Sequence, residues 1–123
     1  MIAYKWTIKK DNKYYPLVNF GINLWMKINC SPYEIGKIYI YNGECSHFVN
    51  SIRKRYGHEI DGFHFWKSIN NDILNRWNIF LQQRKQPTIN ATLLCEVEDI
   101  IKETTCNGYP KIIANKFKVL KEI

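Results

Sequence analysis

Alternation of apolar and polar side chains predicts a β-hairpin at the start of the chain. In residues 3–10, two aromatic residues and an isoleucine alternate with lysines and a threonine, as in a strand with one buried face. The polar residues 11–13 have turn chemistry, so we expect residues 14–18 to return as a second strand. Pro16 has no backbone N–H to donate to a neighbouring strand, which favours an edge position for this segment.

Further apolar runs, separated by turn residues, predict the rest of a sheet. The runs that we interpret as strands are residues 20–28, 38–41, 62–66, 88–97 and 111–123. Within them, the side chains that we expect to face the core are Leu93, Cys95, Val97, Phe117, Val119 and Ile123. The intervening residues 98–106 are polar and favour a single helical turn, and residues 107–110 predict a tight turn.

One segment has helical periodicity. It runs from Ser68, which is a good N-cap, to Arg84, and Pro87 ends it. The apolar residues that recur on one face are Ile69, Ile73, Leu74, Trp77, Phe80 and Leu81. We therefore expect an amphipathic helix whose apolar face, including Trp77, lies in the core.

These elements predict one α+β domain over residues 1–123, built as a mostly antiparallel sheet packed against one main amphipathic helix. The 123 residues are 46% hydrophobic and 15% aromatic, which is enough to bury a core. No apolar run is long enough to cross a bilayer, and the first residues lack the pattern of a signal peptide. We expect a soluble cytoplasmic protein that does not bind membranes and whose four cysteines are reduced.

The charge balance is strongly positive. There are 18 lysines and arginines against 11 aspartates and glutamates, a net charge of +7, which favours anionic partners. Three consecutive cations, Arg53, Lys54 and Arg55, lie beside Tyr56 in the least regular part of the chain, residues 44–61. Such a run can bind phosphates while the aromatic ring stacks on a base. The alternative interpretation is a solvated loop that keeps the protein soluble.

Cysteine and histidine side chains raise the question of a metal site. Cys45, His47, His58 and His64 are of the residue types that bind zinc, but their spacing does not match that of a zinc knuckle. We therefore expect neither a metal ion nor another cofactor.

His64 is the residue that we consider for catalysis. An imidazole in the apolar segment 62–66 could act as a general base near neutral pH, and the neighbouring Trp66 is a candidate to line a cleft. The partners that such a base could use are Glu34, Tyr39, Tyr41 and Glu44. The chain has no Gly-rich phosphate loop, nucleophile elbow or HExxH motif. A core histidine bonded to a backbone carbonyl is therefore the competing interpretation.

Three short motifs are spread along the chain. They are Tyr33-x-x-Gly36-Lys37-x-Tyr39, Gly62-Phe63-His64, and Lys116-x-Lys118-Val119-Leu120-x-Glu122. With these motifs the chain resembles a group of small uncharacterised phage and bacterial domains, over nearly its whole length. The resemblance implies a first strand near Tyr4, a G-F-H element before a helix, and a basic closing strand.

The order of strands and helix also resembles, more remotely, compact ADP-ribosyltransferase-like domains. Those domains use a histidine or arginine in the first strand and a tyrosine or serine in the second, whereas the first strand here has Lys5 and Trp6. This departure argues against NAD chemistry, while the layout implies a nucleotide-shaped cleft.

The function that we expect is non-enzymatic binding by a small phage-type or mobile-element protein in the host cytoplasm. The partner would be a host protein or an anionic ligand such as a nucleotide or nucleic acid, and the residues expected to bind it are Arg53, Lys54, Arg55, Tyr56 and His64. The resemblance implies a role in countering host defence. One alternative is a small transferase-type enzyme that uses His64 and a nearby tyrosine. Another is a nucleic-acid-binding accessory protein that uses the cations of residues 53–55.

Overall fold

The computed structural model describes residues 1–16, 32–41, 62–85 and 87–123. In this part of the chain the elements are β1 (Ile2–Lys10), β2 (Lys13–Tyr15), β3 (Ile38–Ile40), β4 (Phe63–Trp66), α2 (Asn71–Gln83), β5 (Ala91–Cys106) and β6 (Tyr109–Glu122). Every strand pair is antiparallel, so the sheet-dominated α+β class is confirmed. The predicted strand 20–28 and the end of the predicted strand 14–18 lie outside the described residues.

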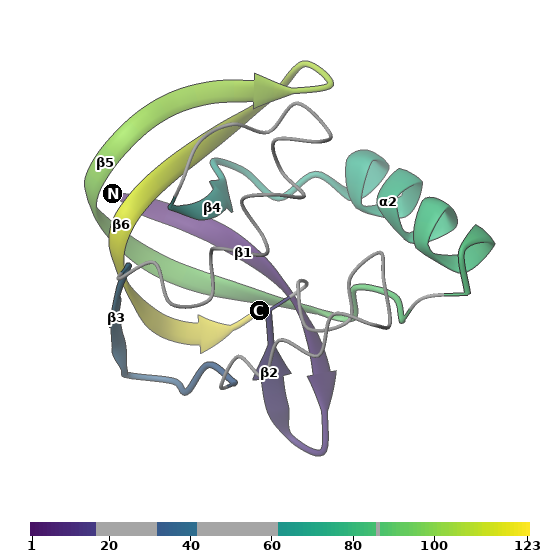
Figure 1. Cartoon of the computed structure of the whole chain (residues 1–123), viewed down its shortest axis with the longest axis horizontal. Coiled ribbons are helices and arrows are strands. Elements are labelled where there is room, and N and C mark those ends of the chain that lie inside the picture. The colour runs from purple at the N-terminus through teal and green to yellow at the C-terminus, as the bar shows by residue number, and fades with distance from the viewer. Residues whose placement is uncertain (17–31, 42–61, 86) are drawn as a thin grey trace.

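The strands curl into a closed ring of pairings (Figure 1). β1 pairs with β4 on one side and with β5 on the other, and β6 also pairs with both β4 and β5. β2 continues the sheet beside β1, and β3 continues it beside β6. The long hairpin of β5 and β6 curves around the other strands, while α2 stands to one side. The ring therefore has an inner face, enclosed by strands, and an outer face.

A two-residue turn connects the two strands in each of the hairpins β1–β2 and β5–β6. Asp11 and Asn12 join β1 to β2 with φ of 53° and 61°, and Asn107 and Gly108 join β5 to β6 with φ of 53° and 84°. Two successive left-handed residues form a type I′ turn, whose twist matches that of the paired strands. Both predicted turns are confirmed at their central residues, whereas Lys13 belongs to β2, and Tyr109 and Pro110 belong to β6.

The helical turn predicted at residues 98–106 is wrong, because these residues continue β5. Register shifts interrupt the pairing of β5 with β6 twice, once between Ile100 and Lys102, and Asp99 has a φ of 55°. Bulges of this kind break the two-residue alternation and bend the strand. The sequence pattern therefore loses its strand character at the point where the hairpin curves.

An aromatic core, the inner cluster, fills the inner face of the ring. Its central ring is Phe117 of β6, which lies 4.8 Å from Phe63 and 5.0 Å from Phe65 of β4 between centroids. Tyr33 and Tyr39 also contact Phe117. The other buried members are Ala3, Tyr14, Ala91, Leu93, Cys95, Val97, Ile112, Ala114 and Val119. The inward positions predicted for strands 88–97 and 111–123 are therefore confirmed, except for the last residue, Ile123, which is 51% exposed.

A second group of apolar side chains, the outer cluster, combines residues of β1, β4 and α2 with residues from the segment before β5 and from the tip of the β5–β6 hairpin. Its buried members are Trp6, Trp66, Ile73 and Ile89, and the rings of the two tryptophans are 4.5 Å apart. The half-buried side chains packed against them are Tyr4, Leu74, Trp77, Leu81, Cys106 and Tyr109. Trp77 is thus half-buried rather than a core residue, whereas Trp66, considered for a cleft, is a core residue.

The helix α2 begins later than predicted. Asn70, not Ser68, is the N-cap, because its Oδ1 accepts hydrogen bonds from the backbone N–H groups of Asp72 at 3.1 Å and Ile73 at 3.4 Å. Ile69 therefore lies before the helix and is 55% exposed instead of buried. No helix in the described part of the chain is long and apolar enough to span a membrane.

Candidate functional site

Of the residues predicted to bind a ligand, His64 alone lies in the described part of the chain. Arg53, Lys54, Arg55 and Tyr56 lie outside the described residues, so their role stays a prediction. The same holds for the other members of the considered metal set, which are Cys45, His47 and His58. Among the described residues, no group of three or more His, Cys, Asp and Glu side chains could hold a metal ion.

His64 occupies the middle of β4, between β1 and β6. Because side chains alternate along a strand, Phe63 and Phe65 face the inner cluster while His64 and Trp66 face the other way. In register, His64 is paired with Ile113 of β6 and Trp66 with Lys111. The position of His64 therefore follows from the alternation in the sequence Phe-His-Phe-Trp.

The imidazole of His64 contacts a lysine on the outer face. The ammonium group of Lys111 lies 3.3 Å from His64 Nδ1 and 5.1 Å from the centroid of the Trp66 ring. An ammonium group can only donate hydrogen bonds, so Nδ1 is the acceptor and the hydrogen of the neutral ring lies on Nε2. The cation is thus held between a neutral nitrogen and the face of an indole.

A second lysine reaches the same residue from the inner face. Lys5 of β1 donates a hydrogen bond from Nζ to the backbone carbonyl of His64 at 3.0 Å. Its ammonium group lies 4.7 Å from the centroid of Phe65 and within 5.8 Å of three more rings, those of Tyr33, Phe63 and Phe117. The two strands that flank β4 therefore each bring one positive charge to His64. Lys5, His64, Trp66 and Lys111 together form what we call the His64 site.

The tyrosines considered as catalytic partners pack against aromatic rings of the inner face. Tyr39 accepts a hydrogen bond at its Oη from the backbone N–H of Glu34 at 2.8 Å, and its ring stacks on Phe117. The ring of Tyr41 packs edge-on against Phe63. These contacts favour a packing role for both tyrosines, and Glu44 lies outside the described residues.

Cys95 was predicted to be a core residue, and this is confirmed. Burial raises the pKa of its thiol to about 11, while the nearby charge of Lys5 lowers it by a smaller amount. A thiol with this pKa is protonated at neutral pH and is a poor nucleophile. Cys95 and Cys106 are both free cysteines.

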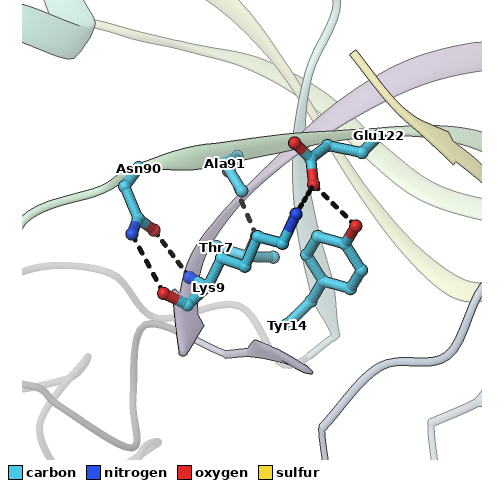
Figure 2. Close-up of polar contacts among 6 residues, drawn as sticks. All are labelled: Thr7, Lys9, Tyr14, Asn90, Ala91 and Glu122. Carbon is cyan, nitrogen blue, oxygen red and sulfur yellow. Dashed lines mark hydrogen bonds and ion pairs between the residues drawn. The ribbon is translucent and has the colours of Figure 1, made fainter. Parts of the chain in front are cut away.

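A polar group that the sequence did not indicate joins the last strand to the first hairpin. Figure 2 shows that one carboxylate oxygen of Glu122 lies 2.8 Å from Lys9 Nζ and accepts a hydrogen bond of 2.6 Å from the hydroxyl of Tyr14. Asn90 fixes the backbone of Lys9, accepting from its N–H at 2.6 Å and donating to its carbonyl at 3.0 Å. We call Lys9, Tyr14 and Glu122 the latch.

The hydrogen bonds of the latch shift the pKa values of its three side chains. The hydrogen bonds from Lys9 and then Tyr14 lower the pKa of Glu122. The hydrogen bond to Glu122 raises the pKa values of Lys9 and of Tyr14. Glu122 is half-buried, because Lys9 of β1 and Tyr14 of β2 contact its carboxylate near the end of β6.

Comparisons with protein families, with curated proteins and with solved structures gave no significant match. The resemblance to small phage and bacterial domains is therefore still a prediction from the sequence motifs.

Proposed function

We propose that the protein is a non-enzymatic binding protein for an anionic ligand, which it holds on the outer face of β4. The observation that carries this proposal is the convergence of Lys5 and Lys111 on His64 from opposite faces of one strand. Of the two charges, the ammonium group of Lys111 lies on the outer face, where it can attract an anion. The net charge of +7 adds a long-range field of the same sign.

The chemistry of the His64 site suits a phosphate group. Lysine binds phosphate as a point charge, and a hydrogen bond to an ionised group is stronger than one between neutral groups. Lys111 cannot swing freely, since its ammonium group is placed by both the imidazole and the Trp66 ring. A cation that is already positioned loses less side-chain entropy when it binds a ligand.

We further infer that the amphipathic helix packs against the sheet beside this site. Ile73 of α2 is buried in the outer cluster with Trp6 and Trp66. The ammonium group of Lys111 lies over the ring of the same Trp66. The helix would then form one wall next to the proposed ligand.

The candidates for the partner and for the biological setting come from the sequence. A host protein with an acidic surface, a nucleotide or a nucleic acid would each supply the anion, and a role against host defence is the one that the motif resemblance implies. A nucleic-acid partner would also be expected to contact the cations of residues 53–55.

A transferase-type enzyme is the weaker candidate. A general base must gain and lose a proton during the reaction. The Nδ1 atom of His64 accepts from Lys111, and protonation of that atom would place two cations side by side. The contact therefore favours binding over proton transfer at this residue.

The proposal is tested by measuring the binding of a short fluorescein-labelled oligouridylate by fluorescence anisotropy at several salt concentrations. We expect Lys111→Met to weaken binding by about ten- to a hundredfold, because a hydrogen bond to a charged group contributes about 1.5–3 kcal/mol. The matched control is Lys121→Met, which removes the same charge from an exposed position on the same strand. Equal affinities of the two variants would show that only the overall charge matters and would refute the site.

A further inference from the structure

The strand β3 has one edge that no other described strand covers. Among the described elements it pairs with β6 alone, at the end of the strand order. Towards β6, the carbonyl of Lys37 accepts a hydrogen bond of 3.1 Å and the N–H of Tyr41 donates one of 2.7 Å. Alternate residues of a strand bond to opposite sides. The backbone N–H and C=O groups of Ile38 and Ile40 therefore point to the other edge, which we call the open edge.

The side chains beside the open edge are apolar and exposed. Ile38 and Ile40 lie on the outer face of β3 and are 52% and 67% exposed. Tyr39, between them, packs on Phe117 of the inner cluster. Exposed β-branched side chains beside outward-pointing backbone groups form a template for an added strand. Proteins use such an edge to bind an extended segment of another chain, with affinity from the backbone and selectivity from alternate side chains.

Lysines lie next to these isoleucines on the outer face. In register, Ile38 is paired with Lys118 of β6. Ile40 is paired in the same way with Lys116. Lys118 is exposed, and no ion pair between described residues includes it. Lys116 lies 3.3 Å from Glu98, but both side chains are largely exposed, and a pair of this kind contributes little to stability. Both lysines can therefore turn toward another anion.

The acidic side chains of this region do not cancel the positive charge beside the open edge. Glu96 and Glu98 belong to β5, on the far side of β6 from β3. Glu34 lies 3.4 Å from the ammonium group of Lys37, so that pair has no net charge. A strand added to β3 would lie about 10 Å from β6, a gap that a lysine and a glutamate side chain can span together. The charge within reach of such a strand is therefore positive.

We propose that the open edge of β3 binds an extended acidic segment of a partner protein, which adds a strand to the sheet. Glutamates at alternate positions of that segment would cover the two isoleucines with their methylene groups and extend their carboxylates to Lys116 and Lys118. The net charge of +7 favours the approach of such a segment. This surface is separate from the His64 site, because β3 pairs with residues 116–118 of β6 and β4 with residues 111–114.

The test measures the binding of fluorescein-labelled heptapeptides to the full chain by fluorescence anisotropy at low salt. The acidic probe alternates valine with glutamate, and the basic probe has lysine in place of each glutamate. We expect the acidic probe to bind at least tenfold more tightly. Lys118→Glu should weaken its binding about tenfold, because an exposed attraction becomes a repulsion of similar size. The matched control is Lys121→Glu, an exposed position beyond the residues that pair with β3, which should have much less effect.

A second pair of variants tests the backbone of the open edge. Ile40→Pro removes an N–H that points away from β6, so the pairing of β3 with β6 is kept, and we expect about tenfold weaker binding of the acidic probe. Ile40→Val keeps the N–H and a branched apolar side chain, and should bind as the wild type does. Hydrogen exchange followed by NMR should show fast exchange at Ile38 and Ile40 in the protein alone and slow exchange with the acidic probe. Circular dichroism checks the fold of each variant.

Three results would overturn this inference. The first is slow exchange of the amides of Ile38 and Ile40 before any probe is added, because the edge would then already be covered. The second is equal binding of the acidic and basic probes, or no binding of either. The third is a dimer in analytical ultracentrifugation that Ile40→Pro dissociates, because the occupant would then be a second copy of the chain. None of these results bears on the His64 site, so the proposed function stands or fails by its own test.

Discussion

The two faces of β4 use the same residue types for different purposes. On the inner face, Phe63 and Phe65 pack against Phe117, and Lys5 lies above these rings. On the outer face, Trp66 packs against Trp6, and Lys111 lies above it. Both faces thus combine stacked aromatic rings with one lysine, and both lysines contact His64.

The difference between the faces is the degree of enclosure. Strands surround the inner cluster, and Phe65 and Phe117 are almost completely buried. The outer cluster has four buried residues, and the side chains that pack against them are half-exposed. Physically, the inner face provides most of the hydrophobic stabilisation, whereas the outer face leaves polar and aromatic groups partly exposed, where the proposed ligand would bind. Stability and binding should therefore respond to different substitutions.

The largest effect should come from the centre of the inner cluster. Phe117→Ala removes a buried ring that contacts four others, so we expect a loss of about 3–5 kcal/mol in the free energy of unfolding. The measurement is urea denaturation followed by circular dichroism. The comparison variant is Phe80→Ala, which removes a half-buried ring from α2 and should cost much less. Equal losses in the two variants would mean that the deeper burial of Phe117 adds nothing to stability, contrary to the comparison.

The sequence predicts this difference only in part. Alternation identified strands at the positions of β1, β3, β4 and β6, because each has one face in an apolar cluster. It missed residues 98–106 of β5, where bulges bend the hairpin and both faces become exposed. Helical periodicity located α2 but placed Ile69 and Trp77 in the core, because periodicity shows which residues share a face and not how deeply that face is covered.

A second substitution tests the contribution of the latch, which joins the end of β6 to the β1–β2 hairpin. Lys9 lies on the same face of β1 as Lys5, since their positions in the strand differ by an even number. We expect Glu122→Gln to lower the melting temperature by a few degrees at pH 7, because it weakens the hydrogen bonds from Lys9 and Tyr14. The melting temperature is measured by circular dichroism across the pH range.

The latch should stabilise the fold less at low pH and less at high pH than near neutral pH. The folded-state pKa of Glu122 lies below its ordinary value of 4.5, so its contribution is present above pH 4.5 and is lost as pH falls through the folded value. The folded-state pKa values of Lys9 and Tyr14 lie above 10.5 and 10.0, so their contribution is present below about pH 10 and is lost as pH rises further. Glu122→Gln should flatten both limbs, whereas the exposed control Glu96→Gln should leave them steep.

The candidate site shows a different limit of sequence reasoning. His64 was identified by residue type, but its partners Lys5 and Lys111 lie 59 and 47 positions away in the chain. Only the register of β4 with its neighbours brings these residues together. No local pattern reports that register, because it is a pairing between strands that lie far apart in the chain. The basic residues 53–55, in contrast, stand out in the sequence but lie outside the described residues.

The smallest expected effect is a change of tautomer at His64, and it reports most directly on the outer face. An ammonium donor at Nδ1 requires the hydrogen of the neutral ring to lie on Nε2, so ¹⁵N NMR of the imidazole should show the Nε2–H form in the wild-type protein. Lys111→Met removes the donor and should shift the ring toward a mixture of tautomers, whereas Lys5→Met, which acts on the backbone carbonyl, should leave the Nε2–H form in place. An Nδ1–H ring in the wild-type protein would rule out the direct hydrogen bond. The lysine and histidine would then be two separate donors, both available to an anion between them, and the comparison of the two faces would have to be redrawn around that anion.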